Sequence, residues 1–131
     1  MNIEDQLRYL QQELKNVEAM LQEQIKDKEL NEQLLKDVDE LNNMKEDDEL
    51  IVPISKGIFV RLKLKEFNGF VVNVGNNVLV DKDIDGIKKL LQDNIKILDE
   101  NINVLKQQEQ KLLELIDQLV NEMNKSNKNQ N

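Results

Sequence analysis

Residues 50–91 read LIVPISKGIFVRLKLKEFNGFVVNVGNNVLVDKDIDGIKKLL, and apolar residues recur at every second position in much of this segment. Within residues 58–65, Ile, Val and Leu alternate with Phe, Arg and Lys, and residues 70–74 repeat the alternation. A period of two is typical of a strand that buries one face. Shorter apolar runs precede and follow this pair. We therefore expect four short strands over about residues 50–81.

Turn residues separate the expected strands. Ser55-Lys56-Gly57 and Gly75-Asn76-Asn77 part the two outer strands from their neighbours. Asn68-Gly69 supplies the left-handed conformations for a turn between the two central strands. Pro53 has no backbone N–H to donate, so the first strand is expected to lie at an edge or to pair only through its other side.

The segment before the strands carries the seam of a coiled coil. Its first six Ile, Leu and Val residues are spaced alternately four and three apart, the a/d pattern: Ile3, Leu7, Leu10, Leu14, Val17 and Leu21. The same register then meets polar residues, whereas another apolar row has a shifted phase: Leu30, Leu34, Val38 and Leu41. We expect one helix over about residues 3–46, with a seam that slips near Ile25.

A second helix is expected over about residues 83–124. Asp83 is suited to accept hydrogen bonds from the free amides of its first turn. The seam residues of this helix are Ile87, Leu91, Ile95, Leu98, Ile102, Leu105, Leu112, Ile116, Leu119 and Met123, with Glu109 in the one missing slot. A second apolar row repeats every seven residues beside it and widens the apolar face: Leu90, Ile97 and Val104. The polar tail, residues 125–131, is expected to fray.

The two expected helices are similar in length, at about 42 residues or roughly 60 Å each. Helices of equal length joined by a short strand region favour an antiparallel pair whose free ends finish together. The sequence therefore predicts a single domain over residues 1–131, mainly α with a small β region: a long antiparallel coiled coil of two helices joined by β-hairpins.

The composition excludes most catalytic chemistry. The chain has no Cys and no His, which removes thiolate and imidazole metal ligands and the commonest general base. Ser55 and Ser126 are the only serines and have no histidine partner for activation. The acidic run 46–49 lacks the ligand spacing and central Gly of a calcium loop, so we interpret it as a solvated helix end. We expect no catalytic residue, no metal, no cofactor and no enzymatic activity.

Charge and hydropathy bear on nucleic-acid binding, membrane insertion and cellular location. Residues 1–49 carry 15 acidic and 6 basic side chains, whereas residues 50–82 carry 2 and 5. An acidic arm repels phosphates, which disfavours nucleic-acid binding. The amino terminus has no basic n-region and no long apolar run, so we expect neither a signal peptide nor a membrane span, and a cytoplasmic location.

Four short strands cannot satisfy their own edges or bury both faces, so this region predicts assembly with another chain. The expected assembly residues are the apolar members of the strands: Val52, Ile54, Ile58, Val60, Leu62, Leu64, Phe70, Val72, Val74, Val78 and Val80.

Residues 50–91 resemble the central region of archaeal α-class prefoldin subunits. The shared features are a Val-Pro followed by Gly, the run V-x-V-G-x-x-V-x-V-x-K over residues 72–82, and immediate entry into the second helix. Asn76-Asn77 stands where small residues are usual, and Ser55-Lys56-Gly57 replaces a turn richer in Gly. The resemblance implies two hairpins between the helices.

The resemblance also implies a function. Prefoldin is an ATP-independent holdase, a hexamer of two α and four β subunits that grips unfolded clients at its coiled-coil tips and delivers them to a group II chaperonin. The apolar residues expected to contact clients are Ile3, Leu7, Tyr9, Leu10, Ile116, Leu119, Val120 and Met123. The alternative is a structural coiled-coil protein that forms filaments or tethers other complexes.

Overall fold

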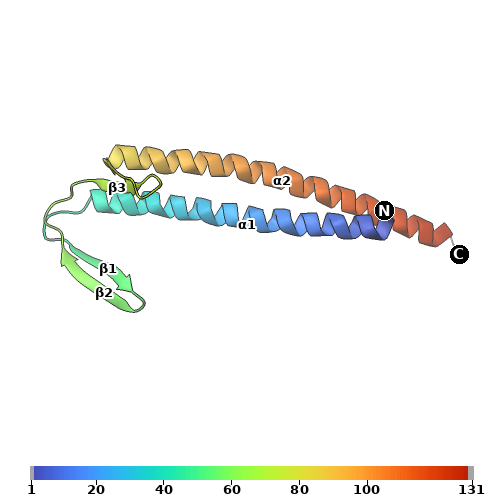
Figure 1. Ribbon diagram of the computed structural model, residues 1–131, viewed down its shortest axis with the longest axis horizontal. Helices are drawn as coiled ribbons and strands as arrows, with labels where there is room; N and C mark the ends of the chain where they lie inside the picture. The colour runs from blue at the N-terminus through green and yellow to red at the C-terminus, as the bar shows by residue number, and fades with distance from the viewer. Residues whose placement is uncertain (1, 130–131) are drawn as a thin grey trace. The chain divides into compact units, whose positions relative to one another are not determined.

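The computed structural model describes residues 2–129, which form two long helices and four short strands (Figure 1). Helix α1 spans Ile3–Asn42 and helix α2 spans Ile84–Asn129. The strands between them are β1 (Glu49–Ser55), β2 (Ile58–Lys63), β3 (Phe70–Asn73) and β4 (Leu79–Lys82). The predicted class, mainly α with two β-hairpins between the helices, is confirmed.

The chain divides into two compact units, each with its own apolar core. The terminal unit contains the described residues up to 30 together with those from 95 onward, and the hairpin unit contains residues 31–94. The core of the terminal unit joins α1 and α2 through Val17, Leu21, Ile102 and Leu105, with Ile25 and Leu112 packed against it. The four core residues and Leu112 belong to the predicted seams, so the predicted pairing of the two helices is confirmed in this unit.

The hairpin unit has a second core, centred on Val38, Ile87 and Leu91. Phe70 and Val72 of β3 pack against these helix residues, so the second hairpin is attached to the helices by its own apolar face. An ion pair between Lys88 and Asp39 also links α2 to α1.

The seam of α1 keeps one register along the helix, and the predicted slip near Ile25 is wrong. After Leu21 the alternate spacing of three and four continues through positions that are buried or half-buried: Gln24, Lys28, Asn31, Leu35 and Val38. Two residues of the predicted shifted row, Leu30 and Leu34, are 59% and 40% exposed. The pattern of apolar residues did not reveal this register, because three consecutive seam positions are polar.

Two of these polar seam residues have partners on α2. The side-chain amide of Asn101 donates a hydrogen bond to the Gln24 side-chain oxygen at 3.2 Å. Lys28 forms an ion pair with Asp99, with 2.6 Å between nitrogen and oxygen. Polar pairs in a coiled-coil seam fix its register at some cost in stability.

The strands form two separate antiparallel hairpins, β1 with β2 and β3 with β4. The first places Leu50 opposite Leu62 and Val52 opposite Val60, and a shift between Pro53 and Ser55 leaves Ile54 as an extra residue on β1. Because β1 has one neighbour, Pro53 lies in an edge strand, as predicted. The extra residue re-aims the end of the hairpin, as β-bulges do.

Each hairpin has a turn at the residues predicted to separate its strands: Ser55-Lys56-Gly57 joins β1 to β2, and Gly75-Asn76-Asn77 lies between β3 and β4. Gly57 and Gly75 have positive φ angles of 79° and 121°, and Asn76 and Asn77 have φ of 49° and 61°. The Asn73 carboxamide accepts a hydrogen bond from the Gly75 backbone N–H at 2.9 Å and so holds the second turn. Glycine and asparagine tolerate these left-handed conformations best.

The predicted turn at Asn68-Gly69 is not a hairpin turn, because β2 and β3 belong to different sheets. Of this pair only Gly69 has a positive φ, at 93°. A side chain there would also bring a Cβ atom within 3.1 Å of the Lys82 carbonyl oxygen. Gly69 therefore permits a close approach between the linker and the end of β4.

The ends of the helices differ from the expected bounds. Helix α1 stops at Asn42, and the acidic run 46–49 starts the first hairpin instead of ending the helix. The Asp47 backbone N–H donates to the Leu64 carbonyl at 2.7 Å, and the Asp48 carbonyl accepts from the Leu64 N–H at 2.8 Å. At the other end α2 continues through Asn129, beyond the expected residue 124, and residues 130–131 of the expected frayed tail lie outside the described part.

The amino terminus of α2 is capped as predicted. The Asp83 carboxylate accepts a hydrogen bond from the Gly86 backbone N–H at 2.7 Å, and the Asp83 carbonyl accepts from the Ile87 N–H at 3.0 Å. This aspartate therefore satisfies an amide of the first turn that has no partner within the helix.

Because the core is narrow, truncating two nearby residues of α2 to alanine is expected to have very different effects on stability. Ile102 is 6% exposed and Val104 is 53% exposed. Ile102→Ala is expected to lower the free energy of unfolding by about 2–4 kcal/mol through the cavity it leaves. Val104→Ala should change it by less than about 0.5 kcal/mol. Urea denaturation followed by circular dichroism measures both, and equal losses would contradict this account of the core.

The cap of α2 can be tested in the same assay. Asp83→Ala is expected to lower the free energy of unfolding by about 1 kcal/mol, because the Gly86 amide loses its acceptor. Asp83→Asn keeps a side-chain oxygen at the same place and should retain most of the stability. If the asparagine variant were as unstable as the alanine variant, the hydrogen bond would not be the source of the effect.

Candidate functional site

The first turns of α1 and the last turns of α2 enclose an apolar hollow in the terminal unit. This terminal groove, as we name it, has a volume of about 340 Å³. It is lined by Gln6, Tyr9, Leu10, Leu115, Gln118, Leu119 and Glu122. The volume lies near the lower end of the range of about 300–1,000 Å³ for small-molecule sites. It suits a few side chains of a longer segment.

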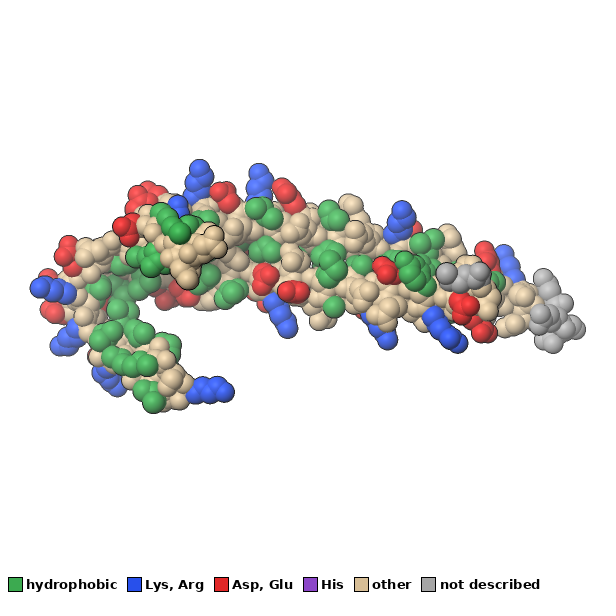
Figure 2. Space-filling view, viewed as in Figure 1, with side chains coloured by type: hydrophobic (Ala, Val, Ile, Leu, Met, Phe, Trp, Pro, Cys, Tyr) green, Lys and Arg blue, Asp and Glu red, His purple; other side chains and the backbone are tan. Residues whose placement is uncertain are grey.

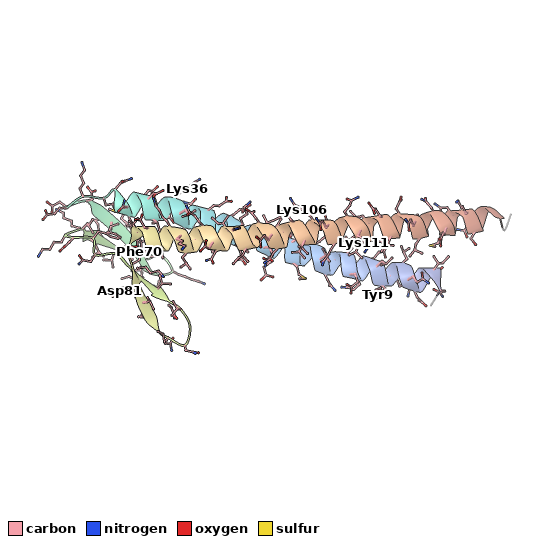
Figure 3. All side chains as sticks on the ribbon, turned by 90° about the horizontal axis from the view of Figure 1, so that it is seen from above. Tyr9, Lys36, Phe70, Asp81, Lys106 and Lys111 are labelled. Atoms are coloured by element: carbon pink, nitrogen blue, oxygen red, sulfur yellow. The ribbon has the colours of Figure 1, made fainter. Side chains whose placement is uncertain are left out.

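The groove exists because a two-helix coiled coil buries only one stripe of each helix. Leu10 and Leu119 are seam residues and are half-buried, whereas Tyr9 lies next to the seam and is 59% exposed. Leu115 is similarly placed beside the seam residue Ile116 and is also exposed. Tyr9 projects from the side of α1 near the start of the helix (Figure 3). Apolar surface is therefore available here without any rearrangement.

A second hollow, of about 560 Å³, lies closer to the helix ends and is more polar. It is lined by Asn2, Ile3, Glu4, Gln6, Met123, Ser126 and Asn127. Gln6 belongs to both hollows, so the two adjoin along α1.

The structure brings together some of the residues predicted to contact clients. Tyr9, Leu10 and Leu119 line the terminal groove, and Ile3 and Met123 line the second hollow. The other three predicted residues line neither of these hollows: Leu7 and Ile116, which are half-buried, and Val120, which is exposed.

Sequence reasoning missed the other residues of the groove wall. Leu115 lies outside the seam pattern, and the polar residues Gln6, Gln118 and Glu122 carry no apolar signal. A search for residues that flank the seam on both helices would have found them, because flanking positions form the walls of a groove whose floor is the seam.

The β1–β2 hairpin presents an exposed apolar surface, and side chains coloured as hydrophobic cover much of it in Figure 2. Because alternate residues share a face, the cross-strand pairs Leu50–Leu62 and Val52–Val60 lie on the same face as Ile58. The opposite face carries Ile51, Phe59 and the ion pair of Arg61 with Glu49, at 2.9 Å.

The β3–β4 hairpin divides its apolar residues between the inside of the chain and the solvent. Phe70 and Val72 are half-buried against the helices, as described above. Val71 and Leu79 point to the other face and are more than 60% exposed. Sequence reasoning assigned Phe70 and Val72 to assembly and omitted the exposed pair, because a pattern of alternation does not reveal which face meets the helices.

The predicted assembly residues therefore occupy three settings. Those that stay exposed are Val52, Ile54, Ile58, Leu62, Val74, Val78 and Val80. Phe70 and Val72 pack within the chain, and Val60 and Leu64 are half-buried. Within residues 2–129 each strand pairs with one neighbour only, so each hairpin also keeps unpaired backbone groups along its outer edges.

Residues 2–129 contain no cluster of three or more Asp or Glu side chains arranged to hold a metal ion. In the same range neither helix has a stretch apolar and long enough to cross a bilayer.

Two helices in coiled-coil contact with two hairpins between them define a recognisable class of fold. The family model for "Prefoldin subunit" matches residues 3–129, nearly the whole chain. The chain belongs to the prefoldin family.

Proteins named prefoldin subunit alpha are similar to this chain. The one from Methanococcus maripaludis strain C5 is 29% identical over 93 residues, which are 71% of this chain and 58% of that protein. The one from Thermofilum pendens is 26% identical over 85 residues, 65% of this chain and 55% of that protein. The matches thus span little more than half the length of these relatives. They confirm the resemblance to archaeal α subunits.

A solved structure shares the fold. It is described as filamentous PFD from Methanocaldococcus jannaschii, and it aligns with a TM-score of 0.77 and 23% identity. The alignment covers 93% of this chain and 99% of that one. It therefore confirms the arrangement of two helices and two hairpins independently of close sequence identity.

Proposed function

We propose that this chain is the α-class subunit of an ATP-independent holdase, a chaperone that binds unfolded proteins and has no catalytic role. The observation that carries the proposal is the terminal groove, an open apolar surface at the free end of a coiled coil. The family match supports it.

The groove suits weak and reversible binding of apolar segments. Its floor consists of Leu10 and Leu119, and Tyr9 and Leu115 extend the apolar surface along its sides. Burying an apolar side chain completely contributes about 1.5–3 kcal/mol. A few partly buried side chains thus give enough affinity to delay aggregation, yet each client segment can leave again.

The hairpins are the proposed attachment to partner subunits. The exposed face of the β1–β2 hairpin and the unpaired edges of both hairpins would be covered by β-class prefoldin subunits, in a hexamer of two α and four β chains. Such an assembly would act in the cytoplasm and pass its clients to a group II chaperonin. This chain needs no nucleotide, metal or cofactor in that scheme.

The second candidate is a structural protein that forms filaments or tethers other complexes. One observation favours it: both hairpins carry exposed apolar residues, so one chain offers two attachment surfaces. Attachment surfaces that repeat head to tail produce open filaments, whereas a capping partner closes the assembly. Electron microscopy of the chain with and without a β-class subunit distinguishes the two, because only the second candidate requires fibres.

Loss of holdase activity is predicted for a variant of the groove rim. Tyr9→Ser with Leu115→Ser removes exposed apolar surface, so the fold should remain intact. About five- to tenfold more protein should then be needed to suppress aggregation of a denatured client, measured by light scattering without ATP. The matched control is Leu30→Ser with Val104→Ser, two exposed apolar residues outside the groove. Equal activity of both double variants would contradict the assignment of the groove.

Adjacent residues of β1 test the assembly surface. Val52→Asp places a charge on the apolar face of the hairpin and should abolish co-elution with a β-class subunit, because an unpaired charge would be buried there. Ile51→Asp places the same charge on the opposite face and should leave co-elution largely unchanged. Size-exclusion chromatography with light scattering measures the assembly, and circular dichroism checks that both variants keep their helices. The reverse order of effects would assign the interface to the other face.

A further inference from the structure

We propose that the terminal groove prefers apolar client segments that carry a lysine or arginine beside the apolar residues. This inference rests on the proposed holdase function and specifies the class of client.

The walls of the two terminal hollows carry negative charge only. The terminal groove contains Glu122 and the second hollow contains Glu4, and neither lining includes Lys or Arg. A hollow farther along the same unit is different, because its lining pairs one acid, Glu13, with one base, Lys111. Within the terminal unit, the hollows at the helix ends are thus lined by acids without a base, whereas the hollow beside Glu13 and Lys111 is balanced.

The carboxylates of these walls are not engaged elsewhere in the described chain. Arg8 lies four residues after Glu4 and Lys125 lies three residues after Glu122, yet neither forms an ion pair with the acid within residues 2–129. Other acids of the two helices are engaged: Asp99 pairs with Lys28, and Asp39 pairs with Lys88. Among the side chains that the structure describes, Glu4 and Glu122 have no ion-pair partner, so each can contact a bound cation.

The order of residues along the groove suits a client segment that has an apolar residue next to a cationic one. The apolar floor of Leu10 and Leu119 adjoins Glu122 and the two amide side chains of Gln6 and Gln118. A client side chain seated on the floor would place a neighbouring residue beside these polar groups. Lysine and arginine fit this arrangement best, because their methylene stems can cover apolar surface while the charged end reaches the carboxylate. An acidic neighbour would meet Glu122 at close range and be repelled.

The expected preference is modest and depends on salt. An exposed ion pair of this kind changes affinity by about two- to fivefold. Such pairs weaken at high ionic strength, because the Debye length, beyond which charges are largely screened, shortens from about 10 Å at 0.1 M salt to about 3 Å at 1 M. Apolar contacts remain under those conditions, so binding should persist while discrimination decreases.

The test uses fluorescent peptides with one apolar sequence flanked by Lys, by Gln or by Glu. Fluorescence anisotropy measures their binding to the full chain assembled with β-class subunits, at low and at high salt. The expected order of affinity at low salt is Lys, then Gln, then Glu. In this chain, Glu122→Gln should weaken the Lys peptide by about two- to fivefold relative to the Gln peptide. The matched control is Glu100→Gln, which removes one charge from an exposed site of α2 outside the groove.

The outcomes separate the two proposals. Equal affinities of the three peptides would overturn the charge preference and leave the holdase function standing. No binding of any peptide would overturn the holdase function itself. A Lys preference that Glu122→Gln and Glu100→Gln reduce equally would overturn the assignment to this groove. Concentration-dependent pairing of the complex without peptide, abolished by Tyr9→Ser, would show that a second copy occupies the groove and would also overturn the proposal.

Discussion

The narrowness of a two-helix seam is the constraint on which the rest of this structure depends. Each helix can bury only the stripe that faces its partner, and the described chain has seven buried apolar residues, of which none is completely enclosed. The apolar residues beside the stripe therefore stay in contact with solvent. In this protein such residues form the rim of the terminal groove. The hairpins also expose apolar residues, because each sheet has only two strands. The surfaces available to partners are thus a direct consequence of the small core.

A seam this narrow needs additional means to hold its register, because Leu, Ile and Val side chains can pack against one another in more than one register. The polar positions that follow Leu21 supply it. Asn101 must lie beside Gln24, and Asp99 beside Lys28, if these groups are to keep hydrogen-bonding partners in a partly apolar setting. The same positions could not be recognised from an apolar pattern. The polar residues that make the pairing of this helix specific are therefore the ones that make its register hard to predict from the sequence.

Most of the fold followed from periodicity. The spacing of three and four from Ile3 to Leu21, the alternation after Ile58, and the cap at Asp83 are local features, and the structure confirms the helix seam, the strand and the cap. The face of that strand expected to be buried stays largely exposed, with Ile58 and Leu62 58% and 47% exposed. The errors arose where tertiary contacts decide. The start of the first hairpin depends on Leu64, a residue far along the chain, which pairs with Asp47 and Asp48. Of the residues predicted to contact clients, Tyr9, Leu10 and Leu119 line the terminal groove, whereas its polar wall required knowledge of which helix faces meet.

The division of the chain into two units with separate cores has a consequence for how this protein can change over evolutionary time. Substitutions in the outer turns of the two helices alter the groove without disturbing Val38, Ile87 or Leu91, which hold the hairpin unit. The groove and the hairpins can therefore change at different rates. Under the proposed function, a lineage could acquire a new range of clients by exchanging a few residues of the outer turns while keeping the hairpin surface unchanged.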